Sequence, residues 1–308
     1  MEHAFDIAAQ SPWLTKPCTP SPRRATGATQ LELEFTGASP IVKWPGGKSR
    51  LLSQLWPLLP PHACTRRYIE PFAGGAAMYF RLRPERAVLA DINAQLVATY
   101  RCVQETVEPL CRALRTLERS HSLEQYYAVR KRYNDTTPDS GLSRCADFIY
   151  LNKTCFNGLH RVNRRGQFNA PAGRYAAPRV VDALRLHAAS YALRTAHLMC
   201  GSFDEVLQMA RAGDFVYLDP PYDVESDACG FTAYAAAPFG PSAQDALASV
   251  FQALDRRGCK LLLSNSATAA NRARYAGYEI TEVVAPRSIS RRADQRRAVA
   301  ELAVRNYS

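Results

Sequence analysis

The sequence predicts an α/β protein with a doubly wound, largely parallel sheet and a mostly helical second region inserted into it. Three observations predict this class. Short strand candidates alternate with segments of helical spacing, a block of helical periodicity near 108–155 interrupts the alternation, and glycine- or proline-rich motifs follow three strand candidates directly. With 308 residues, the chain is long enough for one large or two modest domains.

The elements follow one another in a regular order along the chain. Residues 1–39 are rich in Pro, Ser, Thr and Ala without lasting periodicity, so we predict a disordered extension there. Expected helices lie at 49–59, 75–83, 93–103, 179–191, 203–210 and 242–256. Expected strands lie at 66–70, 87–91, 197–200, 215–219, 260–265, 278–283 and 299–304. We therefore divide the folded part into a sheet domain, 40–107 and 179–308, and an inserted domain, 108–178.

The net charge of +11 is concentrated in two segments. From Phe148 to Val181 there are six basic residues and no acid, and from Arg287 to Arg297 five arginines accompany one aspartate. Together the two segments hold +10 of the +11, so the rest of the chain is nearly neutral. Basicity that is concentrated in this way favours a nucleic acid partner over a merely solvated face.

Cysteine usage and the first residues bear on the compartment. Nine cysteines are scattered along the chain with no C-x-x-C pair, which predicts free thiols and no metal site. No stretch approaches the ~20 apolar residues that span a bilayer, and the first ten residues hold two acids and no basic n-region. We expect a cytoplasmic protein without a membrane partner.

KWPGGKSR, residues 43–50, resembles the end of a phosphate-binding P-loop. That motif requires GxxxxGK[ST], because its first glycine lets the backbone amides turn toward the phosphates. Val42 stands where that glycine belongs, and Trp44-Pro45 stiffens the middle of the loop. We reject a nucleoside triphosphate site here.

Two motifs at the ends of neighbouring strands suggest a nucleoside-type ligand. YIEPFAGG, residues 68–75, places glycines directly after a strand, where a ligand can approach the backbone closely. Asp91 ends the next strand and is suited to accept both hydroxyls of a ribose. An N-cap of the following helix is an equally good interpretation of Asp91.

The third motif, VYLDPPYD at 216–223, is the most informative. Asp219-Pro220-Pro221-Tyr222 follows a strand, and its two prolines make the segment rigid and rich in hydrogen-bond acceptors. An acceptor edge beside an aromatic ring suits the exocyclic amine of a planar base. A simple proline turn after an edge strand is the alternative.

KWPGGK, FAGG, ADIN and DPPY, in this order, resemble the DNA adenine methyltransferase (Dam) family, the alpha group or D12 class of N6-adenine enzymes. YLNKTCFNGLHRVNRRGQFNAPAGRY (150–175), FTAY (231–234), LLLSNSAT (261–268) and RSIS (287–290) are also similar, so the resemblance covers about 41–307. It implies a Rossmann-like S-adenosylmethionine-dependent methyltransferase sheet with an inserted, mostly helical DNA target-recognition domain. Residues 40–107 and 179–308 then form the catalytic domain and 108–178 the recognition domain.

The resemblance also implies roles for individual residues. The catalytic residues are Asp219, Pro220 and Tyr222. S-adenosyl-L-methionine is contacted by Trp44, Lys48, Phe72, Gly74, Asp91, Phe203, Asp204 and Asp219. DNA is contacted by Phe156, Asn157, Leu159, Arg161, Asn163, Arg164, Arg165, Pro171, Arg174, Arg287 and Arg291. One departure stands out, since the family usually has glycine where this chain has Ala76.

The implied reaction is methylation of adenine N6 in double-stranded DNA, with GATC as the expected site and the base flipped into the pocket. Asp219 and the Pro220 carbonyl would accept hydrogen bonds from the two N–H groups of the amine. Tyr222 would stack on the base, and Arg161 would bind the first guanine. We expect a monomer associated with the nucleoid of a bacterial or phage-infected cell.

Two alternatives remain open. An N4-cytosine methyltransferase has the same geometry, usually with serine in place of Asp219. A catalytically silent DNA-binding protein could retain the fold, although Asp219, Tyr222, Asp91 and Lys48 are all present. The residues do not distinguish a restriction–modification role from a stand-alone one.

Overall fold

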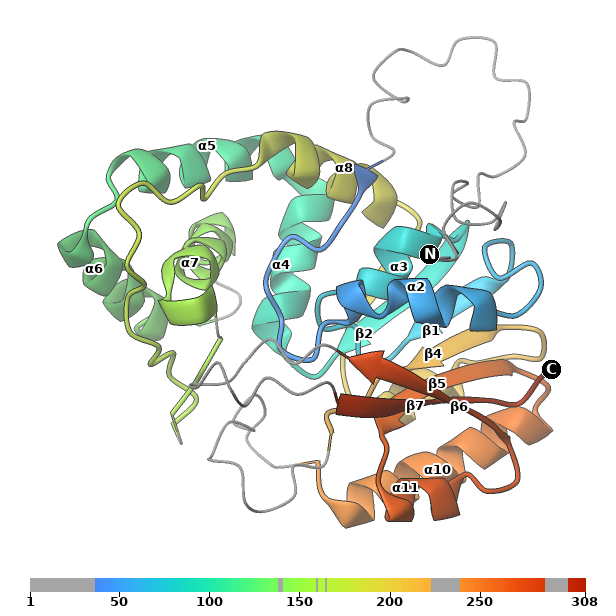
Figure 1. Ribbon diagram of the computed structural model, residues 1–308. Helices are drawn as coiled ribbons and strands as arrows, with labels where there is room; N and C mark the ends of the chain where they lie inside the picture. The colour runs from blue at the N-terminus through green and yellow to red at the C-terminus, as the bar shows by residue number, and fades with distance from the viewer. Residues whose placement is uncertain (1–36, 138–140, 159, 164, 223–238, 286–298) are drawn as a thin grey trace, which may run out of the picture.

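The computed structural model describes residues 37–137, 141–158, 160–163, 165–222, 239–285 and 299–308 (Figure 1). Its helical elements are η3 (Lys48–Arg50), α2 (Leu52–Leu55), η4 (Trp56–Leu58), α3 (Ala77–Leu82), α4 (Ala94–Glu105), α5 (Val107–Arg119), α6 (Leu123–Asn134), α7 (Gly141–Thr154), η5 (Phe156–Gly158), α8 (Ala183–Leu193), α9 (Phe203–Gln208), α10 (Pro241–Arg256) and α11 (Ala269–Arg274). Its strands are β1 (Arg67–Glu70), β2 (Arg86–Asp91), β3 (Ala196–Cys200), β4 (Phe215–Leu218), β5 (Lys260–Ser266), β6 (Glu279–Ala285) and β7 (Val299–Arg305).

The seven strands form one sheet in the order β3-β2-β1-β4-β5-β7-β6. The first five in this order are parallel, whereas β7 is antiparallel to both β5 and β6. The predicted doubly wound, largely parallel sheet is therefore confirmed, and each strand expected from the sequence has its counterpart. The strand order also creates the edge at which open α/β sheets bind ligands, at the carboxyl ends of β2, β1 and β4.

Helices cover both faces of the sheet, which explains why its central strands are apolar on both sides. Successive residues of a strand face opposite sides, so Tyr68 and Tyr217 pack into one core and Ile69 and Val216 into the other. The first core includes residues of α3, α4 and α8, and the second residues of α9 and α10. Figure 1 shows α2 and α3 on one face and α10 and α11 on the other.

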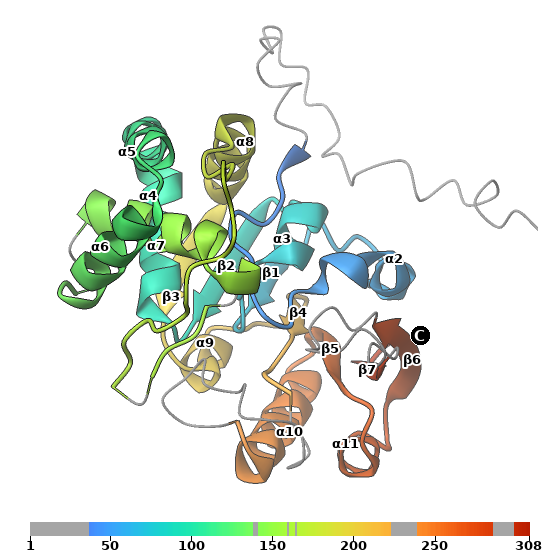
Figure 2. The ribbon, with the colours of Figure 1, turned by 60° about the vertical axis from the view of Figure 1, so that its left-hand side comes forward.

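Helices α5, α6 and α7 lie together to one side of the sheet (Figures 1 and 2). Their buried residues belong to the same hydrophobic core as those of α3 and α4 on the first sheet face. The helical block predicted at 108–155 is thus present, and it packs against α4 and α8 beside the sheet. The division of the chain into a catalytic and a recognition domain stays a prediction.

The helix predicted over 49–59 is wrong as a single element. The segment consists of the three short pieces η3, α2 and η4 instead. Pro57 lies within η4, where its ring removes a backbone donor and prevents an α-helix from continuing.

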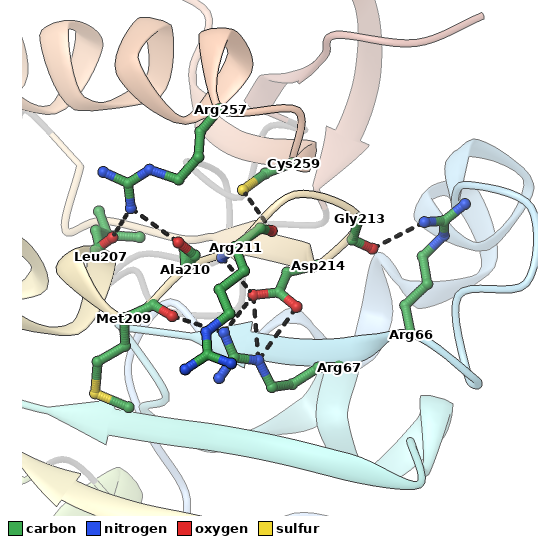
Figure 3. Close-up of polar contacts among 10 residues, drawn as sticks. All are labelled: Arg66, Arg67, Leu207, Met209, Ala210, Arg211, Gly213, Asp214, Arg257 and Cys259. Atoms are coloured by element: carbon green, nitrogen blue, oxygen red, sulfur yellow. Dashed lines mark hydrogen bonds and ion pairs between the residues drawn. The ribbon is translucent and has the colours of Figure 1, made fainter.

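Arginine side chains hold the opposite, amino edge of the sheet together (Figure 3). The Arg67 guanidinium at the start of β1 forms an ion pair with Asp214 at 2.5 Å and donates to the Met209 carbonyl at 2.6 Å. Arg66 donates to the Gly213 carbonyl at 2.8 Å, and Arg257 donates to the Leu207 and Ala210 carbonyls, both at 2.9 Å. These contacts fix the loops at the end of the sheet that faces away from the ligand edge.

Six of the described cysteines form no disulfide, as predicted: Cys102, Cys111, Cys145, Cys155, Cys200 and Cys259. The prediction is wrong for Cys64, which is disulfide-bonded. Across the described ranges no helix has the length and apolar character needed to cross a bilayer.

Candidate active site

Three segments meet at the carboxyl edge of β2, β1 and β4. Asp91 ends β2, the glycine turn 71–75 follows β1, and Asp219–Tyr222 follows β4. Because these strands are adjacent and parallel, the three segments lie side by side at one edge. The motifs singled out in the sequence are therefore brought together by the sheet.

The glycine turn is shaped by close contact with Trp44. Gly74 has a φ of 46°, and a Cβ at this position would lie 2.8 Å from Cδ1 of the Trp44 indole. The position therefore requires glycine. The Gly74 carbonyl accepts a hydrogen bond from the Tyr100 hydroxyl at 2.6 Å, which anchors the turn to α4.

Asp91 is held by the backbone of two neighbouring segments. Its Oδ2 accepts from the Gly74 amide and its Oδ1 from the Asn93 amide, each at 2.9 Å. Burial raises the pKa of Asp91, and these two donors act against that rise. The N-cap interpretation is wrong, since the cap of α4 is Asn93, whose side chain accepts from the Leu96 amide at 3.0 Å. A carboxylate offers about four acceptor positions, so Asp91 has capacity for a ligand hydroxyl.

The KWPGGK loop is fastened to the helical block. The Asn152 side chain of α7 accepts from the Lys43 amide and donates to the Lys43 carbonyl, both at 2.8 Å. The Trp44 indole stacks on the His160 imidazole with ring centroids 5.4 Å apart. His160 is only 3% exposed, and this burial lowers its pKa to about 4. The loop next to Gly74 is thus held from the inserted region.

Lys48 forms an ion pair with Asp219 inside the site. Its Nζ lies 2.7 Å from Asp219 Oδ1 and donates to the Gly46 carbonyl at 2.8 Å, while the lysine is only 4% exposed. Burial raises the pKa of Asp219 to about 6, Lys48 opposes this rise, and Glu301 adds to it. The Asp219 carboxylate therefore changes protonation close to neutral pH.

Glu301 of β7 contacts two residues of this site and was not indicated by the sequence motifs. Its Oε2 accepts from the Tyr222 hydroxyl at 2.5 Å and lies 3.9 Å from Lys48 Nζ. The Lys48 ammonium lies 4.5 Å from the centroid of the Tyr222 ring. The available signal was a single acid within the otherwise apolar strand VAELAV.

A second missed carboxylate lies beneath the site, at the end of β1. Glu70 is 2% exposed and accepts from the Tyr68 hydroxyl at 2.9 Å. Burial raises its pKa well above the ordinary value.

The proline segment is supported from α10 by the buried Gln244. The Gln244 side chain accepts from Asn265 at 2.9 Å and donates to the Pro221 carbonyl at 3.4 Å.

Three aromatic rings cluster beside the glycine turn. Phe72 stacks on Phe203 with centroids 5.4 Å apart, and both rings meet Phe239 edge-on. The sequence had indicated Phe72 and Phe203 but not Phe239. Asp204 is exposed in the first turn of α9, next to this cluster.

The described residues between 154 and 173 form an irregular β-hairpin. Its two arms are paired by isolated bridges between Cys155 and Ala172 and between Val162 and Phe168. Its tip is a turn closed by the Gly166 amide donating to the Asn163 carbonyl at 2.9 Å. Asn134 of α6 ties the hairpin down by donating to the Phe168 carbonyl at 3.0 Å and accepting from its amide at 2.8 Å.

The hairpin gathers most of the predicted DNA-contact residues. Phe156 is 54% exposed, and Asn157 has a positive φ of 58°. Arg161 is exposed and donates to the Asn169 side chain and carbonyl, and the Asn163 side chain accepts from the Arg165 and Gln167 amides. Pro171, Arg165 and Arg174 are also exposed. Leu159, Arg164, Arg287 and Arg291 lie outside the described residues.

Within the described part of the chain, no group of three or more acid, Cys or His side chains could hold a metal ion.

Comparisons with known proteins are consistent with this site. Residues 44–289 match the model of the D12 class N6 adenine-specific DNA methyltransferases. The chain is 38% identical to type II methyltransferase M.MjaIII of Methanocaldococcus jannaschii over 285 residues, which is 87% of this chain and 99% of that protein. It is 35% identical to type II methyltransferase M1.LlaDCHI of Lactococcus lactis subsp. cremoris, covering 87% and 95%. It is 34% identical to the DNA adenine methylase of Escherichia coli K12, covering 85% and 93%.

The family model matches more than half of the chain, and these relatives are aligned over nearly their whole length. The matched residues include the glycine turn, Asp91 and the Asp219–Tyr222 segment. Because this family is adenine-specific, the match argues against the alternative that the chain is an N4-cytosine methyltransferase. The chain belongs to the D12 class of N6 adenine-specific DNA methyltransferases.

Proposed function

We propose that this protein methylates N6 of adenine within GATC in duplex DNA, with S-adenosylmethionine as the methyl donor and the target base flipped out of the helix. The observation that carries the proposal is the buried Lys48–Asp219 ion pair beside the Tyr222 ring, next to the Gly74–Asp91 turn. A carboxylate, an aromatic ring and the glycine turn therefore lie at one edge of the sheet, which supports the proposal. The relatives named DNA adenine methylase support adenine as the target.

The residues present fit S-adenosylmethionine. Asp91 retains acceptor capacity for ribose hydroxyls, and Phe72, Phe203 and Phe239 form an apolar aromatic surface suited to an adenine ring. The Trp44 indole packs on Gly74 and would cover the bound donor from that side. We keep Asp204 as a cofactor residue because it lies exposed beside Phe203. Bound S-adenosylmethionine supplies an electrophilic methyl group on a sulfonium sulfur.

Asp219 and Pro220 orient the amine in this mechanism. The N6 lone pair is delocalised into the adenine ring, so the nitrogen is a weak nucleophile. The Asp219 carboxylate and the Pro220 carbonyl accept hydrogen bonds from the two N–H groups of the amine. These hydrogen bonds turn the nitrogen lone pair out of conjugation with the ring. The negative charge of Asp219 then stabilises the positive charge that develops on nitrogen. Methyl transfer to nitrogen would break the carbon–sulfur bond of the donor and leave its electron pair on sulfur. The proton that the amine then releases would pass to Asp219, whose pKa of about 6 suits it to accept one.

Lys48 serves Asp219 in this scheme. Without a partner, the buried Asp219 carboxylate would have a still higher pKa and would be neutral at neutral pH. The Lys48 ammonium 2.7 Å away lowers this pKa and so keeps Asp219 partly ionised. This role places Lys48 on the catalytic side of the pocket. The family resemblance also implies that Lys48 contacts the cofactor, whose methionine carboxylate would be a second ligand for the same ammonium.

The hairpin 154–173 is the DNA-reading element. An adenine in a duplex cannot reach Asp219 unless it leaves the stack, and the exposed Phe156 ring is suited to fill the space that the base vacates. Arg161 reads the first guanine of GATC through its fork of donors. Asn157, Asn163 and Pro171 line the same hairpin, and Arg165 and Arg174 bind phosphates. We retain Leu159, Arg164, Arg287 and Arg291 as further DNA contacts.

Methylation mapping tests the proposal. Plasmid DNA from a methylation-deficient host that expresses this chain is sequenced for modified bases, beside hosts expressing Asp219→Ala and Asp245→Ala. Asp245 is an exposed aspartate of α10 paired with Arg274, so its variant controls for the loss of an acid away from the site. We expect N6-methyladenine at GATC with the wild type and with Asp245→Ala, and none with Asp219→Ala.

Other outcomes separate the parts of the proposal. Methyladenine at a different site would retain the chemistry and reject GATC and the Arg161 assignment. Unmodified DNA from a protein that binds S-adenosylmethionine would reject DNA adenine as the substrate of this chain. Unmodified DNA together with no cofactor binding would favour the silent DNA-binding alternative.

A further inference from the structure

Glu301 is a buried acid of β7, the strand next to the edge strand β6. It is 8% exposed on β7, and the next three residues of the strand are fully buried apolar residues. Strand β7 lies between β5 and β6, with Glu301 opposite Ser266 on one side and Val283 on the other. Burial of a carboxylate costs several kcal/mol unless partners compensate for it. The residue therefore requires an explanation.

Charge balance does not provide that explanation. Among the described residues, Lys48 is the cation within salt-bridge distance of Glu301, and it lies closer to Asp219, at 2.7 Å, than to Glu301, at 3.9 Å. A second buried carboxylate beside one ammonium makes the local charge more negative and raises the pKa of Asp219 further. An uncharged residue at position 301 would therefore leave the Lys48–Asp219 pair better balanced.

The contact that uses Glu301 is its hydrogen bond to Tyr222. The Tyr222 hydroxyl donates to Oε2 at 2.5 Å, and the same oxygen faces the Lys48 ammonium. The ammonium in turn lies 4.5 Å from the centroid of the Tyr222 ring. Glu301 therefore contacts both the hydroxyl end of the ring and the cation that packs on its face, from a strand in the interior of the sheet.

We propose that Glu301 is a positioning residue for methyl transfer: it holds the Tyr222 ring and the Lys48 ammonium in fixed places beside Asp219, so that the flipped adenine meets a preorganised stacking surface. This inference rests on the proposed function, because Tyr222 needs a fixed orientation only if a base stacks on it. A ring held from a rigid strand loses no rotational freedom when the base arrives.

The inference has a pH signature. Asp219 is faced by Lys48 and Glu301, by Glu70 at the end of β1, and by the hydroxyls of Tyr217 and Tyr222. Glu301 raises the pKa of Asp219, so its replacement by glutamine lowers that pKa. The acid limb of the rate profile then moves to lower pH, a change that a purely structural role would not produce.

The test compares Glu301→Gln, Glu301→Ala, Tyr222→Phe and the double variant Glu301→Ala/Tyr222→Phe with the wild type. Glu279→Gln is the matched control, since Glu279 is an exposed acid of the neighbouring strand β6. Initial methylation rates on a duplex containing the target site give kcat and KM, and 2-aminopurine at the target adenine reports the flipped base by fluorescence. Melting temperature and the Kd for S-adenosylmethionine are measured for every variant.

We expect Glu301→Ala and Tyr222→Phe each to lower kcat by about tenfold or more, the size of a lost hydrogen bond to a charged group. The double variant should be no worse than either single one, because both remove the same contact. Glu301→Gln keeps an acceptor for Tyr222, so it should retain more activity than Glu301→Ala while its acid limb moves to lower pH. Glu279→Gln should match the wild type in all readouts.

Three results would overturn the inference: single losses that multiply in the double variant, a Glu301→Gln profile that coincides with that of Glu279→Gln, or kcat losses that track melting temperature. If instead the wild type methylates no adenine while it binds S-adenosylmethionine, the proposed function itself fails, and this outcome is distinct from the other three.

Discussion

The Asn152 side chain closes two hydrogen bonds with the backbone of Lys43, each 2.8 Å long, across 109 residues of sequence. It thereby joins helix α7 to the loop whose next residue, Trp44, packs on the Gly74 turn. Any movement of the helical block relative to the sheet must act on this loop. We therefore expect the affinity for the methyl donor to depend on a residue far from the donor itself.

Asn152→Ala should weaken S-adenosylmethionine binding by about tenfold, because a loop held by two hydrogen bonds of roughly 1 kcal/mol each loses its fixed place. Titration calorimetry measures the Kd. Asn134→Ala is the matched control, since Asn134 makes the same pair of bonds to the backbone of Phe168 in the hairpin. Equal losses of cofactor affinity in both variants would contradict the expectation.

Lys48→Met should move the acid limb of kcat/KM to higher pH. The free enzyme loses activity as Asp219 takes up a proton, which we expect at about pH 6. Lys48 lowers the pKa of Asp219, so without it the carboxyl is protonated at a higher pH and activity falls earlier on acidification. Lys260→Met is a suitable control, because Lys260 also packs on a tyrosine ring, that of Tyr307, but at the other edge of the sheet.

His160→Phe should reduce the acid sensitivity of the fold. Burial lowers the pKa of His160 from 6.5 to about 4, so in this window the unfolded chain binds a proton that the folded protein does not. His160 does not reduce the free energy of unfolding above pH 6.5. As the pH falls from 6.5 toward 4, the free energy of unfolding of the wild type decreases by up to about 3 kcal/mol because of this residue. Urea unfolding of both proteins at several pH values measures the difference. Parallel pH curves for the two proteins would contradict it.

Ala76→Gly should leave the free energy of unfolding within about 1 kcal/mol of the wild type. Ala76 has a φ of 52° and a ψ of 38°, where a Cβ costs roughly 1–2 kcal/mol. Glycine relieves that strain. It also removes a buried methyl group, which lowers the free energy of unfolding by ~0.8 kcal/mol, and it increases the conformational freedom of the unfolded chain, which lowers it by a further ~0.4–1 kcal/mol. Ala77→Gly, at the first residue of α3, relieves no strain and should destabilise by about 1–2 kcal/mol. A larger loss at position 76 than at 77 would refute the argument.

Arg161→Ala should relax specificity, whereas Arg165→Ala should weaken binding evenly. Loss of a guanine contact costs about 1–3 kcal/mol at one base position, and loss of a phosphate contact reduces the salt slope of log Kd by about one. Kd values for GATC and for duplexes with single-base changes, at several salt concentrations, separate the two effects. A uniform loss for Arg161→Ala would show that it binds phosphate.

Local sequence patterns were sufficient for much of this protein. The alternation of strands and helices, the glycine turn, Asp91 and the Asp219–Tyr222 segment all depend on neighbouring residues, and parallel strands bring their carboxyl ends to one edge. The motifs were equally sufficient for the family, which the comparisons confirm. Where local patterns competed, they misled: Pro57 breaks the helix expected over 49–59, and Asn93 rather than Asp91 caps α4.

The tertiary structure alone decided which distant residues complete the site. Glu301 reaches Tyr222 because antiparallel β7 enters between β5 and β6, and no local pattern specifies that strand order. The contacts of Asn152 with Lys43 and of His160 with Trp44 likewise depend on how the helical region is placed beside the sheet. A single sequence specifies the chemistry of each segment, because propensity and motif are short-range. Pairings across a hundred residues depend on the packing of the whole core, which only the folded chain determines.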